Sequence, residues 1–207
     1  MSRYLIALDC SFTRTGICII DLVEKKIYFY TASEKIGEKQ FENVVHAGQS
    51  IVNQLKTIFN TYSDDYDLII EAPLPMSSMS SALYSLDTLI YNEFELHIKM
   101  SYNPATLRSR IHGRKYDKND SVNLASKYLK ILEDNGYIIN MMLGKARKIP
   151  HDCCEAFLYA HLYLHDNGNS EFQFDNSDEI VKYKERMKNL KKQEKLLMKE
   201  ELNNGKI

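Results

Sequence analysis

The stretch that decides the fold is RYLIALDCSFTRTGICIIDLVEKKIYFYTA, residues 3–32. It holds three short apolar runs, at 3–9, 15–21 and 26–32, which are separated by short polar segments. The runs are rich in Ile and Tyr, which favour strands, and the short connections are typical of antiparallel neighbours. We therefore expect the chain to begin with three consecutive antiparallel strands, the first of which ends in the acid Asp9.

After this stretch the pattern changes to helices that alternate with single strands. Apolar residues spaced by three and four predict an amphipathic helix of about five turns at 38–60. The remaining predicted elements are strands at 66–73 and 94–100, helices around 79–93, 119–134 and 151–165, and a short helix at 103–111. This order favours an α/β fold, in which three antiparallel strands are followed by parallel strands in one mixed sheet with flanking helices.

The composition is that of a globular domain followed by a charged tail. The chain has 207 residues, of which 44% are hydrophobic and 27% are charged, so one sizeable core is expected. We assign residues 1–170 to the domain. We expect residues 171–207 to form a tail that is helical by propensity, because KYKERMKNLKKQEKLLMKEEL is rich in helix formers but charged and without a strong apolar stripe. The sequence shows neither a signal peptide nor an apolar run of about 18 residues, which favours a cytoplasmic protein that does not contact membranes.

Four acids fall at the ends of predicted elements. Asp9 ends the first strand and Glu71 ends the fourth, while Asp152 and Glu155 share one face of the first turn of the last helix. If the first and fourth strands are neighbours, all four carboxylates meet and repel one another unless cations neutralise them. Oxygen ligands suit Mg²⁺ or Mn²⁺, and two such ions can activate water in phosphodiester hydrolysis. Taken singly, each acid also has an ordinary explanation as a turn or helix-cap residue.

The middle of the chain is basic although the whole protein is nearly neutral. Between Lys99 and Lys148 we count eleven Lys and Arg against four Asp and Glu, in a chain whose net charge is −1. This distribution indicates an anionic partner on one face, and a merely solvated surface is the alternative.

Zinc and disulfide chemistry fit the sequence poorly. The four cysteines, Cys10, Cys18, Cys153 and Cys154, form no C-x-x-C pair, which predicts reduced thiols that pack in the interior. No second Cys/His cluster completes a tetrahedral site with the first turn of the last helix. For His151 a contact to phosphate, assistance to a water molecule and a helix-cap role all remain open.

These motifs resemble the RuvC family of Holliday junction resolvases, within the RNase H-like superfamily. LDCSFTRTGICII (8–20) matches the family's first acid and the Thr-Gly pair that begins its second strand. LIIEAP (68–73) matches the second acid, and HDCCEAFLYA (151–160) matches the two acids spaced by three and followed by Ala. NPATLRSRIHGRKYDKND (103–120) is similar to the family's basic segment.

The resemblance implies a metal-dependent endonuclease that resolves four-way DNA junctions by paired nicks. Its metal ligands would be Asp9, Glu71, Asp152 and Glu155, which would hold two Mg²⁺ ions, with Mn²⁺ possible and with Asp9 shared between the ions. Two paired nicks require two active sites, so a homodimer through the helices around 41–59 and 79–93 is implied.

The basic segment would supply the contacts to branched DNA. Lys118 or Arg108 would stabilise the charge that develops on the scissile phosphate. The residues expected to bind DNA are Arg108, Arg110, Arg114, Lys115 and Lys118.

The sequence departs from the family pattern in ways that suggest a divergent, phage-type member. Cys10 and Ser11 stand where the family has a small glycine, and Glu155 stands where it usually has Asp or His. Two alternatives stay open: an RNase H-like nuclease that acts on forks, flaps or RNA, and a non-catalytic junction-binding protein. An actin-like phosphotransferase is disfavoured, since it needs two such domains and about twice this length.

Overall fold

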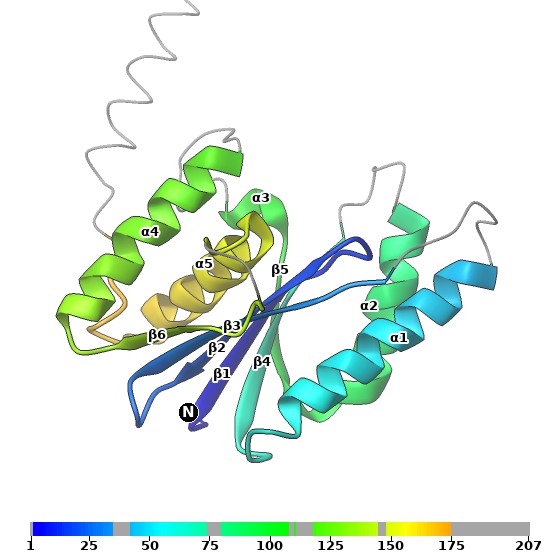
Figure 1. The fold of residues 1–207 in the computed structure, drawn as a ribbon, viewed down its shortest axis with the longest axis horizontal. Coiled ribbons are helices and arrows are strands. Elements are labelled where there is room, and N and C mark those ends of the chain that lie inside the picture. The colour runs from blue at the N-terminus through cyan, green and yellow to red at the C-terminus, as the bar shows by residue number, and fades with distance from the viewer. Residues whose placement is uncertain are drawn as a thin grey trace, which may run out of the picture.

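The computed structural model describes residues 2–34, 42–73, 80–107, 110, 118–144 and 148–174 (Figure 1). The expected tail beyond residue 174 therefore lies outside the described residues. The strands are β1 (Tyr4–Asp9), β2 (Thr15–Asp21), β3 (Lys26–Ala32), β4 (Tyr66–Glu71), β5 (Ile98–Tyr102) and β6 (Ile138–Met141). The helices are α1 (Glu42–Phe59), α2 (Ser80–Phe94), α3 (Pro104–Leu107), α4 (Lys118–Asp134) and α5 (His151–Asp166), with a 3₁₀ turn η1 (Glu95–His97).

The strands form one six-stranded mixed sheet in the order β5-β4-β1-β2-β3-β6. The first three strands pair antiparallel, as predicted, and β4 then pairs parallel to β1. The outer strands β5 and β6 run parallel to β4 and β3. This arrangement confirms the predicted α/β architecture, an RNase H-like mixed sheet with flanking helices.

Helices cover both faces of the sheet, so the central strands are buried on both sides (Figure 1). In β1, Leu5 and Ala7 belong to the apolar core under α4 and α5, whereas Ile6 and Leu8 belong to the core under α1 and α2. All four side chains are fully buried, which explains why β1 is a continuous apolar run rather than an alternating one.

Two strands differ from the sequence prediction. The strand expected at 94–100 begins at Ile98, because Phe94 ends α2 and packs against Phe59 with ring centroids 5.1 Å apart. Strand β6 was not predicted at all. Its four residues include Asn140, and Ile138 is 55% exposed, so the local pattern is weak and pairing with β3 stabilises the strand.

The described chain ends in a segment that packs back on the domain. Phe172 is fully buried, and Glu171 accepts hydrogen bonds from Lys25 and from the Tyr137 hydroxyl. Glu171 and Phe172, at the start of the segment that the sequence assigned to the tail, thus contact the domain. Among the described helices, none has the length and apolarity needed to cross a membrane.

Candidate active site

The parallel pairing of β1 and β4 brings two of the predicted acids together. Leu8 is paired with Ile70, so Asp9 and Glu71 lie at adjacent ends of neighbouring strands. Asp9 is only 8% exposed. Burial raises its pKa well above the ordinary value, and the hydrogen bond and charge of Glu71 and the charges of Glu155 and Asp152 raise it further. A buried carboxylate surrounded by three other acids is a site that attracts a cation.

Helix α5 delivers the other two acids because Gly16 lets its first turn approach the sheet. Gly16 is the residue of β2 that pairs with Asp9. A Cβ atom at this position would lie 2.2 Å from the carbonyl carbon of Asp152 and 2.5 Å from the backbone nitrogen of Cys153. Only a residue without a side chain permits this backbone-to-backbone contact. The glycine therefore sets the distance between the α5 acids and Asp9.

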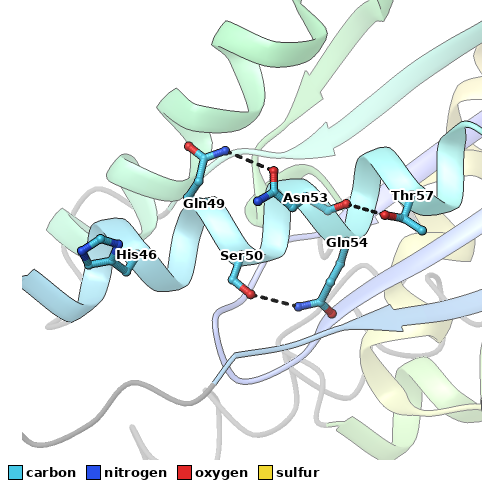
Figure 2. A pocket seen from close by; sticks show the side chains of 6 residues that line it. All are labelled: His46, Gln49, Ser50, Asn53, Gln54 and Thr57. Atoms are coloured by element: carbon cyan, nitrogen blue, oxygen red, sulfur yellow. Dashed lines mark hydrogen bonds between the residues drawn. The ribbon is translucent and has the colours of Figure 1, made fainter.

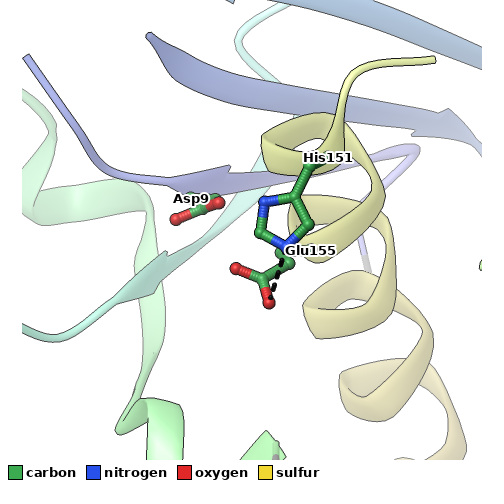
Figure 3. A group of neighbouring side chains, drawn as sticks. All are labelled: Asp9, His151 and Glu155. Atoms are coloured by element: carbon green, nitrogen blue, oxygen red, sulfur yellow. Dashed lines mark ion pairs between the residues drawn. The ribbon is translucent and has the colours of Figure 1, made fainter. Parts of the chain in front are cut away.

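His151, the first residue of α5, points into the acid cluster (Figure 3). Potential ligand atoms of Asp9, His151 and Glu155 all lie within 4.8 Å of one another. The imidazole Nε2 is 3.4 Å from Glu155 Oε1, and Nδ1 is 3.3 Å from Asp152 Oδ1. The interactions with Asp152 and Glu155 raise the pKa of His151 to about 9, although burial opposes the shift. The ring thus faces the acids, and its Nδ1 lies within hydrogen-bond distance of the Asp152 carboxylate.

A second cationic side chain, Arg14, contacts Asp152, and the sequence did not single it out. The Nε–H of Arg14, in the β1–β2 turn, donates to Asp152 Oδ2. Burial acts to raise the pKa of Asp152, but the hydrogen bonds from His151 and Arg14 outweigh it and hold the pKa below its ordinary value. Asp152 is therefore an ionised carboxylate between two cationic side chains.

Helix α4 reaches the site through Ser121. Its hydroxyl, which is fully buried, donates a hydrogen bond of 3.1 Å to Glu155 Oε1 and so helps to orient this acid. Lys118 is the first residue of α4, three residues before Ser121, and its side chain lies outside the described residues. Ser121 carried no signal in the sequence, since a serine in an amphipathic helix is ordinary.

Of the other predicted DNA-binding residues, the structure describes one. Arg108, Arg114 and Lys115 lie outside the described residues. Arg110 is described, and its Nη1 donates a hydrogen bond of 2.6 Å to Asp166, the last residue of α5. At 1.5 Å per residue this is about 22 Å along the helix from His151, so Arg110 lies away from the acid cluster.

Three of the four cysteines are buried packing residues, as predicted, whereas Cys10 is partly exposed. Cys18, Cys153 and Cys154 are buried and free, and burial raises the pKa of each thiol. The Cys153 thiol donates to the carbonyl oxygen of Tyr30. Within the described part of the chain, the residues grouped as potential metal ligands include no cysteine.

The donor set fits a hard divalent cation. Most of its donors are carboxylate oxygens, from acids that converge from β1, β4 and α5. The imidazole of His151 is a further potential donor. In the structure, His151 and Arg14 offset part of the negative charge that such an ion would neutralise.

No protein-family model matches the chain, and no curated protein matches its sequence. A solved structure described as "T. thermophilus RuvC in complex with Holliday junction substrate" matches its fold with a TM-score of 0.50. The match covers 80% of this chain and 96% of that one, at 12% sequence identity. The chain has a RuvC-like fold. At this identity the likeness concerns the fold alone.

Proposed function

We propose that the protein is a metal-dependent endonuclease that cleaves branched DNA and resolves four-way junctions by paired nicks. The observation that carries this proposal is the buried Asp9 carboxylate, which Glu71, Glu155 and Asp152 surround at the ends of three elements of a RuvC-like fold. Such a concentration of acids is costly to fold without a cation, so a function is the better explanation for it.

In this proposal Asp9, Glu71, Asp152 and Glu155 hold two Mg²⁺ ions, and Mn²⁺ can replace them. When bound, the ions supply electrophilic activation of the phosphate and of the attacking water. The chain's own contribution is to fix the carboxylates. Gly16 sets the approach of α5, and Ser121 orients Glu155.

The basic segment is proposed to position the DNA. Lys118 and Arg108 would face the scissile phosphate, and Arg110, Arg114 and Lys115 would bind backbone phosphates. Affinity should then fall steeply as salt is raised, because each neutralised phosphate releases counterions.

A homodimer is proposed because two paired nicks need two sites. The proposed contact helices, α1 and α2, pack together on one face of the sheet (Figure 1). A shallow groove of about 430 Å³ lies along the outer side of α1, where polar residues line it (Figure 2). The lining residues are His46, Gln49, Ser50, Asn53, Gln54 and Thr57. Val45 on the same helix is 57% exposed and offers an apolar contact.

The test compares labelled four-way junction, fork, flap, linear duplex and RNA–DNA hybrid, each with Mg²⁺ or Mn²⁺. Symmetric nicks on the junction alone are expected, and Asp9→Asn should abolish them. Cleavage of forks, flaps or RNA instead would support the broader nuclease. Tight junction binding without any nicking would identify a non-catalytic binding protein and overturn the proposal.

A further inference from the structure

Both carboxylate oxygens of Asp152 are already engaged in the structure. Oδ2 accepts the Arg14 hydrogen bond, and Oδ1 lies 3.3 Å from His151 Nδ1. The potential ligand atoms within 4.8 Å of one another belong to Asp9, His151 and Glu155, and Asp152 is not among them in the part of the chain that the structure describes. Asp152 is thus an acid of the cluster with both carboxylate oxygens in contact with cationic side chains.

The turn that carries Arg14 is anchored on both sides. The Thr15 hydroxyl is fully buried and donates a hydrogen bond of 2.6 Å to the carbonyl oxygen of Ser11. Phe12 is only 2% exposed and packs in the core beneath α1 and α2. By contrast, the Arg14 side chain is 48% exposed. The guanidinium can therefore leave Asp152 by rotating its side chain, without a change in the backbone of the turn.

The Arg14–Asp152 pair is of a kind that another anion can displace. A half-exposed ion pair contributes little to stability, and this one uses a single guanidinium nitrogen. Guanidinium binds phosphate at least as well as carboxylate, often through two nitrogens. A phosphate that entered beside the acid cluster would offer Arg14 a second partner and would release Asp152.

We propose that Arg14 is a positioning residue that keeps Asp152 from binding metal until a DNA phosphate draws the guanidinium away. This inference rests on the proposed nuclease function and adds an order of events to it. Without DNA, the ion that needs Asp152 binds weakly. With DNA, Asp152 is released and that ion binds more tightly, and by linkage the metal also tightens DNA binding.

The test measures Mn²⁺ binding to the full-length protein without DNA, by the loss of the free-Mn²⁺ electron paramagnetic resonance signal. Wild type is compared with Arg14→Gln, Arg14→Lys, Asp152→Asn and the double variant Arg14→Gln/Asp152→Asn. Arg14→Gln should bind its weaker Mn²⁺ about two- to fivefold more tightly, the range expected for removal of one half-exposed ion pair. Arg14→Lys keeps the charge and should resemble wild type.

The double variant separates positioning from a simple charge effect. If Arg14 acts through Asp152, the gain from Arg14→Gln disappears when Asp152→Asn is present. A gain that persists there would overturn the proposal, because it would come from the lost positive charge alone. Arg3→Gln is the matched control, since its partly exposed guanidinium pairs with Asp21 at the end of β2 opposite the acid cluster, and it should leave Mn²⁺ binding unchanged.

Junction DNA provides the second readout. The DNA is added to a Glu71→Gln protein, which should not cleave it, and it should tighten Mn²⁺ binding to this protein. In the double variant Glu71→Gln/Arg14→Gln, the DNA should have much less effect on Mn²⁺ binding. Equal Mn²⁺ binding by wild type and Arg14→Gln would refute the positioning role while leaving the metal centre intact. If wild-type protein that is folded by circular dichroism does not bind Mn²⁺, the proposed function is refuted, and the positioning role with it.

Discussion

Gly16→Ala is expected to damage the site through a single methyl group. The added Cβ would lie 2.2 Å from the carbonyl carbon and 2.3 Å from the carbonyl oxygen of Asp152, both backbone atoms. Ordinary Cβ contacts begin near 3.4 Å, so the first turn of α5 must move by about 1 Å. That turn carries His151 and Asp152, and Glu155 follows directly after it, so the proposed ligand groups on α5 move away from Asp9.

The magnitude follows from this displacement. Overpacking of this kind costs about 1–3 kcal/mol, which for a domain of this size lowers Tm by roughly 2–12 °C. A misplacement of about 1 Å at reacting groups costs about 100-fold in rate. We therefore expect a folded protein with a modestly lower Tm and a far larger loss of junction nicking and of Mn²⁺ affinity.

The assay is nicking of a labelled four-way junction with Mg²⁺, together with thermal unfolding monitored by circular dichroism. Gly48→Ala is the matched control, because its Cβ would meet the end of the Leu89 side chain at 2.7 Å, which can rotate aside. The control should keep wild-type nicking. If Gly16→Ala unfolds at the wild-type Tm and nicks within twofold of wild type, the close approach of α5 does not set the site.

Three further outcomes are expected. Ser121→Ala should lower Mn²⁺ affinity or nicking by about 10- to 100-fold because Glu155 loses its orienting hydrogen bond. Ser126→Ala is the control and should change neither, because the Ser126 hydroxyl donates to the Val122 carbonyl oxygen of its own helix. Because the pKa of Asp9 is raised on folding, metal-free protein should lose stability as pH rises above about 4. Asp9→Asn should remove that part of the pH dependence, as urea unfolding across pH would show. Burial lowers the pKa of His161 from 6.5 to about 4, so about 3 kcal/mol of stability should be lost as pH falls through that window. His161→Phe should abolish this loss. An acid-unfolding midpoint in His161→Phe that equals the wild-type midpoint would contradict the prediction.

Much of the fold followed from local pattern. The first three strands were predicted because their runs are continuous, apolar and rich in Ile and Tyr, and the major helices because their apolar residues repeat at helical spacing. Strand β6 escaped prediction because a four-residue edge strand with Ile138 exposed has no local signature. Its existence depends on a pairing partner, β3, more than a hundred residues earlier in the chain.

For the site, the sequence alone determined the candidate acids, since Asp9, Glu71, Asp152 and Glu155 fall at element ends where the order of strands can bring them together. Only the tertiary structure decided how they are used. Arg14 is 138 residues from its partner Asp152, and Ser121 is 34 residues from Glu155. Hydrogen bonds across such separations leave no periodicity in a sequence, because they depend on where packed elements place side chains in space. The same holds for Gly16, whose role is set by the backbone of a distant helix.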